Sequence, residues 1–350
     1  MTEKPNILIA SPLEEIYVEK IRSSSKGKFN VILDPELLPP TRYIADHNGI
    51  ENFIHTQTQE KKWNNYLEKS EILWDFPFNL GKKNSKIQIP KKVKWIQTTS
   101  SGIGQKVKKI NFLNPKIIIT TARGIHAKPL TEFVFFSILN FYKNKEILDL
   151  SKKEKSWKRY CGIGIEGKSI GIIGAGGIGK QIIKLAKAFD MKTMVLKSPY
   201  SSVKNTTFVD EVFEFNHLHE MVKKTDVLVL CAPHTSQTEN ILNKQAFEVC
   251  KDGMILINIS RGSLIDEKEL ISALKTKKIA FAALDVFKIE PLPKESPLWT
   301  LDNVMISPHS ASTVENENEL ITDIFCHNLN HYINGDFVNM KNVFDFNKMY

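Results

Sequence analysis

The stretch SIGIIGAGGIG at residues 169–179 decides the fold of this chain. Its apolar start, Ser169–Ile173, has the length of a buried strand, and the amphipathic run Ile178–Phe189 after the glycines has a helical period. In a GxGxxG motif between strand and helix, the first glycine permits a tight turn, the second lets the backbone approach a pyrophosphate, and the third allows close helix packing. The free N–H groups of the helix N-terminus then face the phosphates. We therefore expect a dinucleotide here, held by Gly174, Gly176, Gly177, Ile178 and Gly179.

The residue after the next strand usually selects the cofactor. In such units an Asp or Glu about 20 residues beyond the glycines binds the ribose 2′-hydroxyl. Counting from Gly179 to the end of Thr193–Leu196 places Lys197 there, and a lysine pairs with a 2′-phosphate instead. This favours NADP over NAD, with Ser198 as a further donor. An ordinary surface lysine in a lysine-rich chain is the alternative.

The alternation of short apolar runs and helical stretches extends outward along the chain. Runs of strand length separated by helices and polar loops indicate parallel sheets covered on both faces. No internal repeat or low-complexity linker interrupts the pattern, so two doubly wound α/β units are the simplest interpretation. The expected strands are Asn6–Ala10, Phe29–Leu33, Ile72–Phe76, Val93–Gln97 and Ile117–Thr121, then Ser169–Ile173, Thr193–Leu196, Val227–Leu230, Met254–Asn258, Ala280–Leu284 and Val304–Ile306.

Two long amphipathic segments frame the second set of strands. The stretch Pro129–Leu150 is predicted to be one helix that crosses between the units, with an apolar face that includes Phe133 and Phe136. A final helix is expected at about Val314–Ile333.

The composition is that of an ordinary globular protein. The 350 residues are 42% apolar and 25% charged, which suggests about two domains. The formal charge of +9 is spread in short clusters without a recognition helix, so solvated lysines explain it better than nucleic-acid binding. Four cysteines without CxxC pairing argue against disulfides and a metal site, and favour a reducing compartment. The apolar run Ile7–Ala10 is too short for a secretory or membrane segment, so we expect a cytoplasmic protein with no membrane association.

Polar residues follow the ends of the later strands. Pro233, Ser260–Arg261, Asp285 and His309 come after successive strands, and in open α/β sheets ligands lie beyond the carboxyl ends of strands. Only five of the 48 basic residues are arginines, so Arg261 is a candidate for a task that needs a planar fork of donors. Each residue alone has an ordinary structural explanation, such as a helix cap or a surface ion pair. Together they indicate an active site.

Several separated segments form a recognisable set: SSGI (100–103), GKSIGIIG (167–174), NISRG (258–262), LDVF (284–287), EPLP (290–293), PLW (297–299), SPHSA (307–311) and NVFD (342–345). They look like the signatures of the D-isomer-specific 2-hydroxy acid dehydrogenases, which the chain resembles along nearly its whole length. Two departures are Lys197 in place of the usual acid and the segment RGIH at 123–126 after the fifth strand. The first departure leaves the choice between NAD and NADP less determined, and the second leaves the substrate less determined.

The resemblance implies an α/β architecture of two doubly wound parallel-sheet domains. A Rossmann NAD(P)-binding domain at residues 124–311 would be inserted into a flavodoxin-like substrate domain, formed by residues 1–123 and 312–350. It also implies a homodimer built around the crossing helix near Pro129–Leu150.

The resemblance further implies that Arg261, Glu290 and His309 are the catalytic residues. Hydride reduction of a ketone generates an alkoxide, so a proton donor must stand beside it, and a histidine with an ordinary pKa of about 6.5 suits that role. Glu290 would accept from the other ring nitrogen and favour the imidazolium. Arg261 would bind the substrate carboxylate and polarise the carbonyl.

The remaining site residues follow from the same resemblance. Backbone N–H groups of Ser101 and Gly102, in a loop with Ile103, would bind the other carboxylate oxygen. Asp285 would contact the nicotinamide carboxamide. The other expected cofactor contacts are Ala232, Pro233, Thr238 and Ser260.

The expected function is an NAD(P)-dependent interconversion of a small anionic 2-keto acid and its D-2-hydroxy acid, with glyoxylate or hydroxypyruvate favoured. One alternative is an enzyme like 3-phosphoglycerate dehydrogenase. Another is a non-enzymatic NAD(H)-sensing protein of the same fold. A formate dehydrogenase is disfavoured, because those family members carry glutamine where this chain has Glu290.

Overall fold

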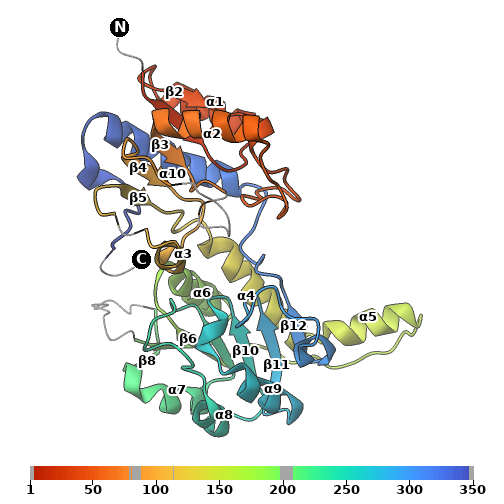
Figure 1. Ribbon diagram of the computed structural model, residues 1–350. Helices are drawn as coiled ribbons and strands as arrows, with labels where there is room; N and C mark the ends of the chain where they lie inside the picture. The colour runs from red at the N-terminus through yellow and green to blue at the C-terminus, as the bar shows by residue number, and fades with distance from the viewer. Residues whose placement is uncertain (1–3, 79, 81–87, 113, 198–207, 347–350) are drawn as a thin grey trace. The chain divides into compact units, whose positions relative to one another are not determined.

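The computed structural model describes residues 4–78, 80, 88–112, 114–197 and 208–346, and the chain forms two compact units (Figure 1). The first unit comprises Met1–Ile125 and Thr313–Tyr350, and the second comprises His126–Ser312. Among the helices described, none combines the length and the apolarity needed to cross a bilayer.

The second unit is built on a seven-stranded sheet in which every pair of neighbouring strands is parallel. The strand order is β12-β11-β10-β9-β6-β7-β8. The order reverses between β6 and β9, which is the dinucleotide-binding arrangement with its ligand crevice at the switch point. The strands are β6 (Ser169–Ile173), β7 (Lys192–Leu196), β8 (Glu211–Phe213), β9 (Val227–Leu230), β10 (Met254–Asn258), β11 (Ile279–Leu284) and β12 (Val304–Ile306).

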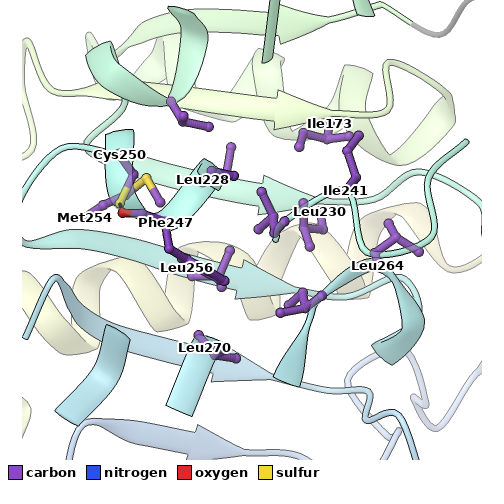
Figure 2. Packing of buried hydrophobic residues seen from close by; sticks show 14 of the residues in the cluster. Ile173, Leu228, Leu230, Ile241, Phe247, Cys250, Met254, Leu256, Leu264 and Leu270 are labelled. Atoms are coloured by element: carbon purple, nitrogen blue, oxygen red, sulfur yellow. Dashed lines mark hydrogen bonds between the residues drawn. The ribbon is translucent and has the colours of Figure 1, made fainter. Parts of the chain in front are cut away.

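Apolar side chains bury both faces of this sheet. Strands β6, β9 and β10 are buried at every residue, as expected of central strands covered on two sides. One face packs into the cluster of Figure 2, which includes Leu228, Leu230 and Leu256. The other face packs with residues of two helices that precede and follow β6. The helices of this unit are α4 (Ala127–Tyr142), α5 (Lys145–Lys153), α6 (Gly177–Ala188), α7 (Leu218–Lys224), α8 (Lys244–Val249) and α9 (Glu267–Lys275).

The first unit contains a five-stranded sheet of order β2-β1-β3-β4-β5, again with parallel neighbours. This is the flavodoxin-like order, whose switch point lies between β1 and β3. The C-terminal helix α10 returns to this unit and packs on α1. The elements are β1 (Asn6–Ile9), α1 (Glu15–Ser24), β2 (Asn30–Ile32), α2 (Gln57–Lys69), β3 (Ser70–Trp74), β4 (Trp95–Gln97), α3 (Gly104–Lys109), β5 (Ile118–Thr120) and α10 (Glu317–Ile333).

The predicted fold class is confirmed, with two differences in the elements. The single helix expected over Pro129–Leu150 is wrong: the chain forms α4 and α5, separated at Asn144, whose φ of 50° is left-handed. A left-handed residue cannot continue a right-handed helix, and asparagine tolerates this conformation better than most residues. The short edge strand β8 was not predicted, because two of its three residues are exposed and it lacks an apolar run.

Candidate active site

Three neighbouring strands end in register at one edge of the seven-stranded sheet. Asn258 of β10 pairs with Leu284 of β11, which pairs with Ile306 of β12. The predicted catalytic residues follow these ends: Arg261 after β10, Glu290 after β11 and His309 after β12. Parallel pairing therefore brings the three loops that carry them to the same edge.

The turn that carries Arg261 is fixed by Asn258, which is fully buried. Its side-chain amide donates to the Arg261 carbonyl (3.0 Å), and its amide oxygen accepts from the backbone N–H and the hydroxyl of Ser260 (both 3.1 Å). Next in the chain, Gly262 lies directly against the backbone of Phe287, where a Cβ would stand 1.9 Å from the carbonyl carbon. Only glycine allows this close approach of the Arg261 turn to the loop that leads to Glu290.

His309 and Glu290 form a hydrogen-bonded pair. Nδ1 of His309 lies 2.8 Å from Oε2 of Glu290, and because a carboxylate only accepts, Nδ1 carries the proton. The other carboxylate oxygen accepts the backbone N–H of Phe287 at 3.0 Å, which holds the carboxyl group in place. Both side chains remain partly exposed. Nε2 of the imidazole is thereby left available for a ligand.

The local charges shift the two pKa values apart. The hydrogen bond with Glu290 raises the pKa of His309, and the charges of Glu290 and Asp285 add to this, against burial and Arg261. Burial raises the pKa of Glu290, but the hydrogen bonds from His309 and Phe287 outweigh it and hold the value below the ordinary one. The pair therefore favours a charged imidazolium beside a carboxylate.

Arg261 lies within the electrostatic reach of both acids. Burial lowers the pKa of its guanidinium, while Glu290 and Asp285 raise it. Arginine stays protonated in proteins at any ordinary pH, so this environment holds a permanent partly buried cation. One of its nitrogens, Nη1, donates to the Ser260 carbonyl at 2.6 Å, which orients the side chain.

Asp285, only 2% exposed, organises the turn that carries His309. Its Oδ1 accepts from the Ser307 hydroxyl (2.6 Å) and from the N–H groups of Ser310 and Ala311 (both 2.9 Å). Its carbonyl accepts the N–H of His309 (2.9 Å), and His309 itself has a left-handed φ of 54°. A non-glycine residue in that region is uncommon and is held here by surrounding bonds.

The glycine motif lies at the switch point of the sheet. Gly174 has a φ of 110°, and a Cβ on it would lie 2.6 Å from the backbone nitrogen of Ala232 at the end of β9. A Cβ on Gly176 or Gly177 would meet no described atom within 4 Å, so the turn before α6 borders open space. An open glycine turn at a helix N-terminus fits a dinucleotide pyrophosphate.

The other predicted cofactor contacts lie in the loop after β9 and at the start of α6. Thr238 is buried and donates to the Pro233 carbonyl at 2.8 Å, which closes the loop after β9. In α6, Gly179 is buried and Ile178 is partly buried against the core. These residues gather on the same sheet edge as the Arg261 turn.

Lys197 follows β7 as predicted but has a partner that the sequence did not suggest. Its Nζ lies 3.1 Å from Oε1 of Glu214, the residue after β8, and the two backbones are joined through Phe213. Ser198 lies outside the described residues. The position predicted to select between the two cofactors therefore carries an ion pair rather than a lone lysine.

The predicted substrate loop lies in the first unit, after β4. Ser101 donates to the Ala122 carbonyl at 3.2 Å, and the N–H of Ala122 binds the Ser100 carbonyl at 3.2 Å. Ile103 is buried and precedes α3, while Gly102 is exposed. The loop backbone is thus anchored to the end of β5.

Sequence reasoning missed the residues that support the site. Ser307 and Glu214 act through contacts with residues of other loops, which no local motif shows. Asn258 acts within its own turn, through Ser260 and Arg261. For Asn258 one signal was present, because a polar residue ends an otherwise apolar strand. Within the described ranges, no cluster of three or more His, Cys, Asp or Glu side chains forms a metal site.

Comparison with known proteins gives concordant matches. The family model of the D-isomer specific 2-hydroxyacid dehydrogenase NAD binding domain matches residues 135–311. The chain is 36% identical to a D-3-phosphoglycerate dehydrogenase of Methanocaldococcus jannaschii over 235 residues, which is 65% of this chain but only 44% of that relative. It is 33% identical to a glyoxylate reductase of Pyrococcus furiosus over 230 residues, covering 65% of this chain and 67% of the relative. A solved structure of a D-isomer specific 2-hydroxyacid dehydrogenase family protein from Aeromonas salmonicida superposes with a TM-score of 0.80 at 25% identity, covering 98% and 100% of the two chains.

Proposed function

Because the chain belongs to the D-isomer-specific 2-hydroxyacid dehydrogenase family, we propose that it interconverts a small 2-keto acid and the corresponding D-2-hydroxy acid with a nicotinamide cofactor. The observation that carries this proposal is the pairing of His309 with Glu290 beside a partly buried Arg261, all on one edge of a dinucleotide-binding sheet. A protonated imidazole and a fixed cation are the two groups that ketone reduction in a keto acid requires.

His309 is the general acid of the proposed reaction. Hydride transfer at the carbonyl carbon is the chemistry that the bound nicotinamide supplies. His309 delivers the accompanying proton from Nε2 to the carbonyl oxygen, because Nδ1 is held by Glu290. In the oxidation direction the neutral imidazole accepts the hydroxyl proton. Glu290 keeps the ring oriented and stabilises its charged form.

Arg261 binds the substrate carboxylate and polarises the carbonyl. A guanidinium offers two parallel donors that match a carboxylate, and in a partly buried site this contact is stronger than in water. The N–H groups of Ser101 and Gly102 bind the remaining carboxylate oxygen. Asp285 has two tasks in this proposal: it fixes the His309 turn and meets the nicotinamide carboxamide.

NADP is the proposed cofactor in preference to NAD. The glycine turn before α6, with Ala232, Pro233 and Thr238, holds the dinucleotide, and Ser260 borders it. Lys197 pairs with the 2′-phosphate, for which it must exchange its contact with Glu214. A lysine at this place supports the phosphate-bearing cofactor because it cannot accept from ribose hydroxyls.

Glyoxylate or hydroxypyruvate is the proposed substrate, and 3-phosphoglycerate is the alternative. Relatives named glyoxylate reductase and hydroxypyruvate reductase, 33% and 37% identical to this chain over 230 and 180 residues, support the smaller substrates. A panel of 2-keto acids assayed with NADH and NADPH in parallel tests both choices. A preference for phosphohydroxypyruvate would indicate that 3-phosphoglycerate is the substrate. Cofactor binding without any turnover would indicate a non-enzymatic NAD(H)-sensing protein.

A homodimer is proposed as well, with α4 and α5 at its interface. Figure 1 shows α5 extending away from the seven-stranded sheet of its own unit. It has no buried residue, and the segment exposes Leu148, Leu150 and Trp157, the last at 99%. An exposed apolar surface of this kind is typical of a protein interface.

A further inference from the structure

Asp75 stands at the switch point of the five-stranded sheet in the first unit. It directly follows β3, and the N–H of Ala10 at the end of β1 binds the carbonyl of Trp74 at 2.9 Å. In a 2-1-3-4-5 sheet the ligand crevice lies outside the carboxyl ends of these two strands. The residue is therefore placed where this type of sheet binds ligands.

The conformation of Asp75 is unusual for a buried residue. It is 7% exposed, yet its φ is 65°, in the left-handed region that non-glycine residues rarely occupy. Its N–H binds the Gln97 carbonyl (2.6 Å) and its Oδ1 accepts the N–H of Phe76 (2.7 Å), so the turn is held from both sides. Left-handed residues of this kind concentrate at functional sites.

Its other carboxylate oxygen holds the loop after β4. Oδ2 accepts the hydroxyl of Thr99 at 2.7 Å, and Thr99 is itself buried. One residue earlier, the Thr98 hydroxyl binds the Ser100 carbonyl at 2.9 Å. Together with the contacts of Ala122, these bonds fix the backbone between Thr99 and Gly102. The Asp75 carboxylate is thus the one acidic group tied directly to this loop among the described residues.

The Asp75 carboxylate is hydrogen-bonded by neutral groups among the described residues. No described lysine, arginine or histidine forms an ion pair with it, and only neutral donors, Phe76 N–H and Thr99 O–H, contact it. A buried carboxylate is screened less by solvent than an exposed one, so its charge acts over a longer distance. Any anion bound at the loop experiences that charge.

We propose that Asp75 positions the Thr99–Gly102 loop for one substrate carboxylate and, by its charge, selects 2-keto acids with a single negative group over those with a second. This rests on the proposed function, in which Ser101 and Gly102 bind the substrate carboxylate. The hydrogen bond to Thr99 holds the loop whose Ser101 and Gly102 N–H groups bind the substrate carboxylate. The Asp75 carboxylate repels an additional anionic group of the substrate, such as a phosphate or a second carboxylate. Asp75 is a positioning and specificity residue and takes no proton in the reaction.

The test compares hydroxypyruvate with phosphohydroxypyruvate, which differ by one phosphoryl group. In Asp75→Asn the amide still bonds Thr99, whose hydroxyl becomes the acceptor, and asparagine tolerates a left-handed φ. The charge is lost, while the size of the side chain and its contact with Thr99 are kept. We expect kcat/KM for phosphohydroxypyruvate relative to hydroxypyruvate to rise by about three- to tenfold, the effect of one partly screened charge several ångströms away.

Two variants at Thr99 separate the effect of the Asp75 charge from the effect of its hydrogen bond to the loop. Thr99→Val keeps the charge and breaks the tie to the loop, so KM should rise for both substrates by the same factor, and Thr99→Ser should restore it. Circular dichroism and the thermal midpoint verify that each variant is folded.

The proposal is overturned if folded Asp75→Asn leaves the substrate ratio unchanged, or if the parent protein prefers phosphohydroxypyruvate. Oxamate is a monoanion and tartronate is a dianion. The thermal stabilisation that each of them gives in the presence of NADPH measures the preference for one negative group over two without turnover. If no keto acid is reduced, the proposed function fails while this binding preference still decides the role of Asp75.

Discussion

At the scale of single residues, the proposed reduction depends most on the protonation of His309. Reduction requires the imidazolium, so kcat/KM should fall as pH rises through the His309 pKa, which the hydrogen bond with Glu290 raises above its ordinary value. Glu290→Gln keeps a hydrogen bond but removes the charge, so the falling limb should move to lower pH while activity at low pH is partly kept. A pH profile of kcat/KM for the parent and the variant measures this shift.

The matched control at this position is His309→Gln. It removes the proton donor at every pH and should lower kcat/KM by on the order of 100- to 10,000-fold without a shifted limb. If folded Glu290→Gln retained the parent's limb, the 2.8 Å contact between the two side chains would have no part in catalysis.

A substitution at Arg261 tests whether binding of the substrate carboxylate needs the paired donors of a planar guanidinium or only a positive charge. Lysine keeps the cation but offers a single point of contact, so Arg261→Lys should lose roughly 30- to 1,000-fold in kcat/KM, equivalent to about 2–4 kcal/mol. Steady-state kinetics with the preferred keto acid provide the measurement. Near-parental kcat/KM in the lysine variant would exclude a bidentate carboxylate contact.

At the scale of elements, the ends of β7 and β8 should set the cofactor preference together. Lys197→Asp should reverse or flatten a preference for NADPH. Glu214→Gln removes the competing acid 3.1 Å from the lysine and should raise the NADPH to NADH ratio by about two- to tenfold, a modest factor because the pair is partly exposed.

Calorimetric binding of 2′,5′-ADP and 5′-AMP measures the same preference without turnover. A strong NADH preference in the parent protein, unchanged in both variants, would show that Lys197 and Glu214 are an ordinary surface pair.

The elements also show how far the sequence was informative. Strands β6, β9, β10 and β12 begin and end as predicted. For the first three, continuous apolar runs mark central strands that are buried at every residue. The break at Asn144 could not be read from an amphipathic pattern that continues across it. Likewise, Asp285 bonds Ser307, Ser310 and Ala311, which lie more than 20 residues further along the chain. The strand ends predicted which residues follow this edge of the sheet, but the bonds among those residues required the folded structure.

At the scale of the whole molecule, the exposed apolar surface of α5 predicts an assembly. Leu148→Glu combined with Leu150→Glu places two charges on this surface and should convert a dimer to a monomer. Sedimentation equilibrium measures the change, and Lys152→Glu, on the same helix but polar already, is the matched control. A parent protein that is monomeric at micromolar concentration would contradict the proposed interface.

The central claim is that this chain reduces a 2-keto acid and does not only bind its cofactor. The most direct measurement is NADPH consumption with hydroxypyruvate, together with the configuration of the glycerate produced. We predict turnover that yields D-glycerate, and its loss in a His309→Gln protein that still binds NADPH. A folded parent protein that binds NADPH but reduces no small 2-keto acid, or that yields L-glycerate, would contradict the account.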